Sequence, residues 1–291
     1  MEPPRHLASR LAEAGSVMFI GGLDTGKTTL ARRVAAEALA KGRTVAYVDA
    51  DVGNTTVGPP TCVGLKLMRT RADLESLAVA DDLRFVGGIT SARLVLQAVT
   101  ATAVLCEEAR LVAELVLIDT DSTVSGVAGE TLKYHMTELA RPELVVALQR
   151  GAELEPIIGM LRRFFSVEVI AVPADPDVIP ASPEERAMRR AVRLKEAFAP
   201  PLERWRVRPT VFAPTLPVGL DLARLDGMLV GVHDERGRCR GLGRLEYSDG
   251  HLRVLTNAGE GMRGLRLGSA RIDLDTLELK PVNLREVMFG V

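Results

Sequence analysis

Apolar runs alternate with amphipathic segments along residues 15–175, and this alternation predicts the fold class. The apolar runs predict strands over 17–20, 44–49, 83–87, 115–119, 144–149 and 167–172. Between them, hydrophobic positions recur at helical spacing over 27–41, 91–113, 130–140 and 153–165. Such a sequence of elements predicts an α/β fold in which a parallel sheet is covered by helices on both faces. We expect the C-terminal ends of the strands to meet along one edge, where the following loops can form a site.

A different pattern begins after residue 173. A cap of Ser182 followed by Pro183 predicts a charged helix that continues to about Phe198, before two prolines end it. Farther along, short β-like runs lie at 207–212, 228–233, 238–246, 252–256 and 264–273. We therefore expect an N-terminal extension over 1–14, a main domain over 15–200 that includes the charged helix, and a small β-rich domain over 201–291.

The bulk composition describes an ordinary globular protein and narrows the choice of partners. The 291 residues are 47% hydrophobic and 26% charged, with a formal net charge of −1. A near-neutral chain has no global attraction to nucleic acid or to an anionic membrane, so nucleic acid would need a local basic patch. Cys62, Cys106 and Cys239 form no Cys-x-x-Cys pair, which argues against zinc and disulfides. Because no signal pattern and no apolar run of ~18 residues occurs, we expect a soluble cytoplasmic protein without membrane contact.

The most informative motif is a glycine-bounded loop between the first predicted strand and the first predicted helix. Residues 21–29 are Gly-Gly-Leu-Asp-Thr-Gly-Lys-Thr-Thr, which fits the phosphate-loop template Gly-x-x-x-x-Gly-Lys-Thr. Glycines let backbone N–H groups converge on a phosphate, and the helix that follows presents its positive end to the same anion. In this template the lysine contacts the β- and γ-phosphates and the threonine binds Mg²⁺. The loop predicts a nucleotide site formed by Gly21, Gly22, Leu23, Asp24, Thr25, Gly26, Lys27, Thr28 and Thr29.

Acidic residues end two further predicted strands. Asp49 and Asp51 are two residues apart on an extended segment, so both carboxylates should face the phosphates. Beside Mg²⁺ and a γ-phosphate, one carboxylate can hold the metal or its water shell, and the other can take a proton from an incoming hydroxyl. The strand 115–119 ends in Asp119 and Thr120. For Asp119, a water-mediated Mg²⁺ contact and a structural role in the turn are equally open.

The charged helix after Ser182 carries a group of arginines. Arg186 and Arg190 are four residues apart and share one helix face. Taken alone, this pattern describes a solvated basic helix. Beside a phosphate loop, paired arginines are typical of a mobile lid that stabilises charge on a transferred phosphoryl group.

These motifs, in this order, resemble the polynucleotide 5′-hydroxyl kinases of RNA processing, a family that includes the kinase subunit of the pre-mRNA cleavage factor. In that family a Gly-x-x-Asp-x-Gly-Lys-[Ser/Thr]-Thr loop, here 22–29, precedes an Asp-x-Asp-x-Gly-Gln segment, here 49–54. A strand with a "clasp" threonine follows, matched at Thr120, and then an Arg-x-x-x-Arg lid, matched at 186–190. With the similar C-terminal β domain, the resemblance covers roughly residues 15–280.

The resemblance implies an enzyme that uses ATP and Mg²⁺ and has a phosphate-loop kinase domain. Lys27 and Thr28 would bind the ATP phosphates and the metal, which Asp49 would support. Asp51 would be the general base that activates the 5′-hydroxyl. Thr120 would hold a phosphate of the acceptor strand, and Arg186 and Arg190 would close over the transferring group.

Two positions depart from the family pattern on the acceptor side. Asn54, a predicted substrate contact, stands where the family has the longer Gln. Ser122 and Thr123 stand where the clasp usually continues Gly-Trp or Gly-Leu, and in eukaryotic members that tryptophan stacks on a base.

We therefore expect phosphoryl transfer from ATP to a hydroxyl, with the 5′-OH end of RNA or DNA as the favoured acceptor. The alternatives are a kinase or ligase that acts on a small metabolite, and a nucleotide-dependent switch that binds a protein partner. Retention of Asp51 and the paired arginines argues against the switch. The sequence leaves open whether the nucleotide is ATP or GTP, and which oligomeric state the chain adopts.

Overall fold

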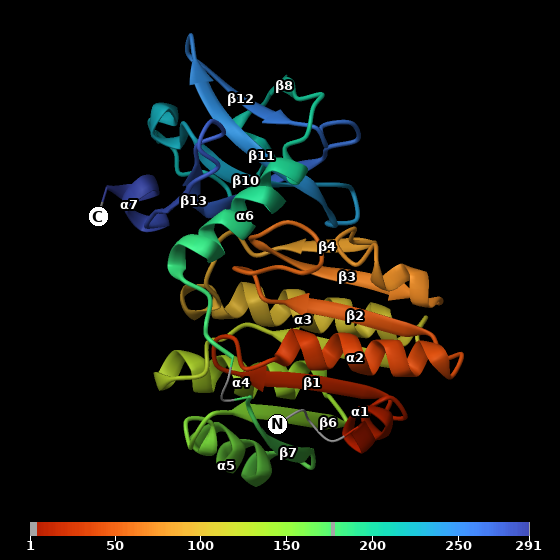
Figure 1. Cartoon of the computed structure of the whole chain (residues 1–291). Coiled ribbons are helices and arrows are strands. Elements are labelled where there is room, and N and C mark those ends of the chain that lie inside the picture. Colours follow the sequence, from red (N-terminus) through yellow and green to blue (C-terminus); the bar gives the residue numbers. More distant parts are fainter. Residues whose placement is uncertain (1–4, 176–177, 291) are drawn as a thin grey trace.

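Two β-sheets organise the chain, and helix α6 (Pro183–Ala197) lies between them (Figure 1). The computed structural model describes residues 5–175 and 178–290. Sheet A has the strand order β4-β3-β2-β5-β1-β6-β7. Its strands are β1 (Ser16–Gly21), β2 (Val45–Ala50), β3 (Cys62–Met68), β4 (Asp82–Phe85), β5 (Leu115–Thr120), β6 (Leu144–Gln149) and β7 (Glu168–Pro173). The predicted α/β class with a β-rich C-terminal part is confirmed.

Five neighbouring strands of sheet A run parallel, and their C-terminal ends meet at one edge as predicted. These strands are β2, β5, β1, β6 and β7. β3 differs, because it pairs antiparallel with both β2 and β4, and the sequence pattern did not predict it. Gly64 and Lys66 interrupt its apolar run. Gly64 is required there, because a Cβ would lie 2.5 Å from the carbonyl oxygen of Val57.

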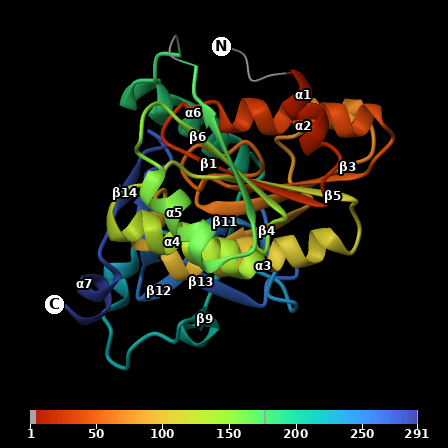
Figure 2. The same cartoon turned by 90° about the horizontal axis from the view of Figure 1, so that it is seen from below.

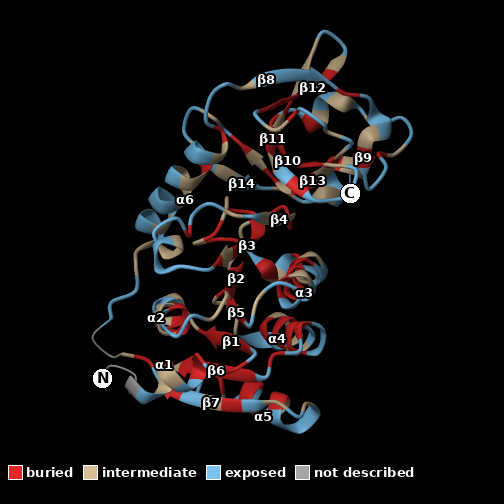
Figure 3. Cartoon of the chain, turned by 90° about the vertical axis from the view of Figure 1, so that its right-hand side faces the viewer, coloured by how far each residue is buried: buried red, intermediate tan, exposed pale blue. Residues whose placement is uncertain are grey.

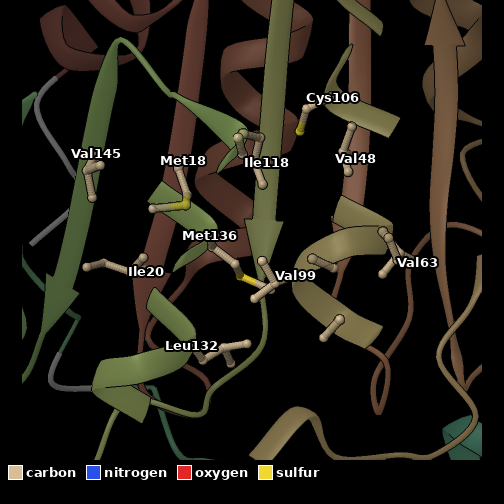
Figure 4. Packing of buried hydrophobic residues seen from close by; sticks show 14 of the residues in the cluster. Met18, Ile20, Val48, Val63, Val99, Cys106, Ile118, Leu132, Met136 and Val145 are labelled. Carbon is tan, nitrogen blue, oxygen red and sulfur yellow. The ribbon is translucent and has the colours of Figure 1, made fainter. Parts of the chain in front are cut away.

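Helices cover both faces of sheet A (Figures 2 and 3). α1 (Arg5–Leu11) and α2 (Lys27–Ala40) pack on one face, and α3 (Val95–Arg110), α4 (Gly126–Ala140) and α5 (Glu155–Phe164) pack on the other. Within β1, Val17 and Phe19 face the first layer, whereas Met18 and Ile20 face the second (Figure 4). Burial on both faces explains why these strands appear in the sequence as continuous apolar runs. Across the two described ranges, no helix combines the length and apolar character needed to cross a membrane.

Part of the expected N-terminal extension forms α1, which packs with α2 on one face of sheet A. Leu11 and Ala12, in and after α1, are fully buried and pack in one cluster with α2 and β1. The first four residues of the extension lie outside the described residues. The described part, residues 5–14, therefore completes the core beneath α2.

Sheet B forms the C-terminal part of the chain, with the order β14-β13-β10-β11-β12-β8 and β9 beside β13. Its strands are β8 (Glu203–Arg206), β9 (Phe212–Ala213), β10 (Met228–His233), β11 (Cys239–Ser248), β12 (His251–Thr256), β13 (Gly264–Ile272) and β14 (Leu279–Pro281). The strand predicted over 207–212 is wrong: Pro209–Val211 form a 3₁₀ turn, since proline lacks the N–H that a strand pair needs. The pattern also did not predict β14 or the short α7 (Leu284–Phe289).

Sheet B rests on the β4 edge of sheet A and on α6. Phe85 of β4 packs in one cluster with Leu194 and Phe198 from α6 and with Leu229 of β10. The Ser269 amide also donates to the carbonyl oxygen of Gly87 at 2.7 Å. These contacts fix the C-terminal half of α6 against both sheets.

Gly231 of β10 lies where sheet B packs closely against Phe85 of sheet A. A Cβ at this position would lie 2.5 Å from Cγ of Phe85, so Gly231→Ala should lower the free energy of unfolding by ~1–3 kcal/mol. Gly159→Ala in α5 is the matched control, because nothing lies within 4 Å of a Cβ there. That control should be neutral, or stabilising by up to ~1 kcal/mol, since alanine favours helix. Denaturant titration measures both variants, and wild-type stability of Gly231→Ala would contradict the close packing.

Candidate functional site

The loop between β1 and α2 has a conformation that only its glycines permit. A Cβ at Gly21 would lie 2.5 Å from Oγ1 of Thr25 and 2.6 Å from the carbonyl oxygen of Leu148. Gly26 has a left-handed φ of 91°, which glycine adopts without steric cost. α2 begins at the next residue, so Lys27 and Thr28 lie in its first turn. The free N–H groups and the positive dipole end of α2 therefore face the loop, as in an anion-binding site.

Lys27 lies inside this loop. Its Nζ donates to the carbonyl oxygens of Gly21 at 2.9 Å and Gly22 at 2.8 Å, and the side chain is buried. Burial lowers the pKa of the Lys27 ammonium group, and the carboxylates of Asp119 and Asp51 oppose that effect. The lysine also lines the adjoining cavity. A cation is thus held where the loop would receive a phosphate.

Asp119, at the end of β5, connects the loop to the neighbouring strands. Its Oδ2 accepts hydrogen bonds from Oγ1 of Thr28 at 2.6 Å and from the Tyr47 hydroxyl at 2.8 Å. Its Oδ1 is buried and has no hydrogen-bond partner among the described residues. Burial raises the pKa of Asp119, and Lys27 acts against that rise. The contact with Thr28 favours a role beside a metal over a role in the turn alone.

The two acids at the end of β2, Asp49 within it and Asp51 just after it, do not face the same way, which corrects our expectation. Asp49 is fully buried, and its Oδ1 accepts from the Asp51 amide at 3.0 Å. Its Oδ2 accepts from the amides of Thr56 and, at 2.9 Å, Val57. Because both oxygens of Asp49 accept hydrogen bonds from backbone amides of the following loop, neither is left free to bind a metal. β2 ends at Ala50, so strand alternation no longer applies to Asp51.

Asp51 lines the cavity, as predicted for the general base. Its Oδ1 accepts from the amides of Gly53 at 3.0 Å and Asn54 at 2.9 Å. Burial raises the pKa of the Asp51 carboxyl, and the hydrogen bond from Asn54 opposes the rise. Asn54 lines the same cavity, and its buried Oδ1 has no partner within the described chain. The structure therefore brings Asp51 and Asn54 together.

Thr120 does not reach the cavity, contrary to the predicted contact with the acceptor phosphate. Its hydroxyl is fully buried, donates to the carbonyl oxygen of Phe19 at 2.8 Å and accepts from Nζ of Lys133 at 3.0 Å. Lys133 also forms a buried ion pair with Oδ1 of Asp121 at 2.9 Å. Ser122, the next residue, lines the cavity instead. Thr120 ends a central strand, so its side chain turns into the layer between β1 and α4.

The arginines of α6 lie along the opposite wall of the cavity. Arg186 donates to the carbonyl oxygen of Ala181, and Arg193 donates to that of Thr56 at 2.7 Å. Arg190 is half-buried, and both this burial and the nearby Arg186 lower the pKa of its guanidinium group, whereas Asp51 raises it. α6 is thus fastened to the loop after β2, with its predicted arginine pair beside Asp51.

These groups meet in a cavity of about 670 Å³ between the phosphate loop, the loop after β2 and α6. The predicted site residues that line it are Leu23, Asp24, Gly26, Lys27, Thr28, Thr29, Asp51, Asn54, Arg186 and Arg190. Gly21, Gly22 and Thr25 form the rest of the phosphate loop. Asp49 and Thr120 support the cavity from behind through the hydrogen bonds described above.

Among the residues of this region that were not predicted as site residues, three hold its acids and loops through hydrogen bonds. Tyr47 precedes Asp49 by two residues on β2 and holds Asp119. Lys133 belongs to α4 and holds the loop after β5. Arg150 follows β6 and donates to carbonyl oxygens of the phosphate loop. Their hydrogen-bond partners are distant in the sequence, so no local pattern could have indicated these residues.

The glycine-bounded loop at the start of α2, with Lys27, Thr28 and Asp119 around it, defines a P-loop nucleotide-binding protein. The chain belongs to the family described as mRNA cleavage and polyadenylation factor CLP1 P-loop, whose model matches residues 21–199. This membership confirms the resemblance found in the motifs. It also implies that the protein uses a nucleotide.

Several curated relatives are archaeal proteins. The chain is 28% identical over 338 residues to a polyribonucleotide 5′-hydroxyl-kinase of Pyrococcus horikoshii, a match that covers 96% of this chain and 92% of the relative. A protein of the same name from Methanocaldococcus jannaschii is 31% identical over 182 residues, covering 62% of this chain and 50% of that one.

Solved structures show the same fold. The chain matches Clp1p in its complex with Pcf11p with a TM-score of 0.67 at 13% identity. The match covers 91% of this chain and 77% of the other. The fold is therefore shared with that protein over most of this chain.

The buried ion pair behind the cavity should contribute strongly to stability. Lys133→Met would leave the Asp121 carboxylate buried without its partner, which should cost ~3–5 kcal/mol. The double variant Lys133→Met with Asp121→Asn should recover part of that loss, because no charge remains unpaired. Lys41→Met is the matched control, since its 2.8 Å pair with Glu13 is exposed and should cost less than ~1 kcal/mol. Denaturant titrations of all three decide the matter, and equal losses at positions 133 and 41 would contradict the assigned role.

Proposed function

We propose that this chain transfers the γ-phosphoryl group of ATP to the 5′-hydroxyl of a polynucleotide, either RNA or DNA. One observation carries the proposal: Lys27, Asp51 and the arginines of α6 line a single cavity. A nucleotide switch needs the phosphate loop, but it needs no carboxylate placed to deprotonate an acceptor hydroxyl. The names of the archaeal relatives support the choice of acceptor.

The phosphate loop would hold the β- and γ-phosphates of ATP. The N–H groups at the start of α2 and the ammonium group of Lys27 supply the positive charge. Thr28 and Asp119 fit a Mg²⁺ ion, because the Thr28 hydroxyl binds Oδ2 of the Asp119 carboxylate while Oδ1 of the same group has no partner in the described chain. When bound, Mg²⁺ would neutralise charge on the phosphates. The metal is thereby assigned to Thr28 and Asp119, and not to Asp49.

Asp51 would accept the proton of the acceptor hydroxyl. The acceptor oxygen forms a bond to the γ-phosphorus while the bond from that phosphorus to the oxygen bridging to ADP breaks, which yields a 5′-phosphate and ADP. Two backbone N–H groups orient the carboxylate of Asp51. Its raised pKa makes it a stronger base than an exposed aspartate.

Arg186 and Arg190 would stabilise the charge on the phosphoryl group as it moves. Each of the two guanidinium groups lines the cavity, and Arg186 disfavours the charged form of Arg190. A phosphate placed between them would relieve this repulsion and accept hydrogen bonds from both. The pair therefore favours the state in which the transferring group is present.

Asn54 and Ser122, and not Thr120, lie on the acceptor side of the cavity. The lining residues include no aromatic ring within the described ranges. Recognition of the acceptor would therefore depend on phosphate and sugar contacts more than on base stacking. Such contacts fit the ends of RNA and DNA alike.

Replacing the base should separate chemistry from nucleotide binding. Asp51→Asn keeps the shape of the side chain but cannot take the proton, so transfer should fall by ~10²–10⁴-fold while ATP affinity is preserved. The assay uses γ-labelled ATP with 5′-OH oligonucleotides, RNA and DNA separately. Near-normal transfer by the variant would contradict the base assignment.

The same assay separates the alternative functions. Labelled oligonucleotide supports the proposed activity. Phosphate release without labelled oligonucleotide favours a nucleotide-dependent switch. Label found only on added small metabolites favours a metabolite kinase.

The arginine pair should matter more than other cations of α6. Arg186→Ala and Arg190→Ala should each lower kcat by ~10–100-fold, because each removes charge-assisted hydrogen bonds to the transferring group. Lys195→Ala, an exposed position of the same helix, is the matched control and should retain wild-type kcat. Equal effects at all three positions would indicate a general charge effect and would refute the assigned roles.

A further inference from the structure

We infer that Asp24 of the phosphate loop is a positioning residue that fixes the arginine-bearing lid. The inference rests on the proposed phosphoryl transfer. Asp24 belongs to the nucleotide site that the sequence predicts, and its backbone N–H can serve a phosphate there, but its carboxylate would repel one. Instead, Oδ2 of Asp24 accepts a hydrogen bond from the Ala181 amide at 2.7 Å. Asp24 has a left-handed φ of 50°, a backbone conformation that aspartate and asparagine tolerate better than most residues.

Ala181 connects Asp24 directly to an arginine of the lid. Its N–H binds Asp24, and its carbonyl oxygen accepts from Nη1 of Arg186. Ala181 immediately precedes the Ser182 cap of α6. Loss of the Asp24 contact would therefore free the residue that holds the guanidinium of Arg186 over the cavity.

Arg150 makes a second connection between the same two segments. Its Nη1 donates to the carbonyl oxygen of Leu23 at 2.9 Å, and its Nη2 donates to that of Asp24 at 2.9 Å. Nη2 also lies 3.4 Å from the carbonyl oxygen of Val178, in the segment that precedes α6. One guanidinium group from the end of β6 thus spans the phosphate loop and the lid segment.

These contacts couple the lid to the state of the phosphate loop. In a trans peptide the C=O and N–H groups point in opposite directions. Because Arg150 binds the carbonyl oxygens of Leu23 and Asp24, the N–H groups of Asp24 and Thr25 point away from it. A phosphate bound by those N–H groups and Arg150 would act on opposite sides of the same two peptides. Nucleotide binding would then stabilise the loop conformation in which Asp24 holds Ala181.

Two substitutions at one position test this coupling. Asp24→Gly removes the acceptor but allows the left-handed backbone, whereas Asp24→Asn keeps an acceptor oxygen and tolerates the same backbone. Asp24→Gly should lower kcat about tenfold or more and raise the KM for ATP by a smaller factor of at most about fivefold, because a contact that bound nucleotide stabilises must in turn stabilise bound nucleotide. Asp24→Asn should restore kcat to within about threefold of wild type. In an Arg186→Ala background, Asp24→Gly should lower kcat by less than about a further twofold, because both substitutions remove the position of the Arg186 guanidinium over the cavity.

Hydrogen exchange gives a readout that does not depend on activity. With ATP and Mg²⁺ present, amides of residues 181–190 should exchange faster in Asp24→Gly than in wild type, and at the wild-type rate in Asp24→Asn. If the wild type fails to label oligonucleotides, the proposed function fails, and the exchange rates still decide the inference. Unchanged exchange in Asp24→Gly, or a raised KM for ATP with unchanged kcat, would overturn it.

Discussion

A buried cluster of opposite charges at the C-terminal edge of sheet A is the constraint on which the rest of the site depends. Burial lowers the pKa of the Lys27 ammonium group, and the nearby carboxylates of Asp119 and Asp51 oppose that effect. The carboxyl groups experience the reverse effect, since burial raises the pKa of both. Hydrogen bonds from Thr28, Tyr47 and backbone amides then fix each carboxylate. Such a cluster is stable only in a fixed geometry, and a phosphate with its metal fits that geometry.

Sheet B contributes to this site through the lid, although it supplies no lining residue to the cavity among the described positions. Leu194 and Phe198 of α6 pack against Phe85 and Leu229, so the C-terminal half of the helix is held by both sheets. The N-terminal half is held by a capping box and by Ala181. The arginines between these two ends are therefore presented from a helix whose position depends on the whole molecule.

The sequence predicted the central fold well because local patterns specify it. The strands of the parallel core are buried on both faces, and their apolar runs are easy to recognise. β3 escaped prediction because Gly64 and Lys66 interrupt its apolar run: Gly64 leaves room for Val57 of the loop after β2, and Lys66 pairs with Asp81. On the site, the phosphate loop, Asp51 and the arginine pair lie together as expected. Asp49 and Thr120 do not, since a strand end leaves the direction of a polar side chain undecided.

The sequence by itself determined the chemistry that is available: a phosphate loop before a helix, acids at the ends of two strands, and a capped helix that carries arginines. These features depend on residues close together in the chain. Only the tertiary structure decided which polar atoms remain free to act. Thr120 donates to the carbonyl oxygen of Phe19, and Asp24 accepts from the Ala181 amide. Asp49 accepts from the amides of Thr56 and Val57. A buried polar group must find a partner, and the partners of Thr120 and Asp24 come from distant parts of the chain that only folding brings together.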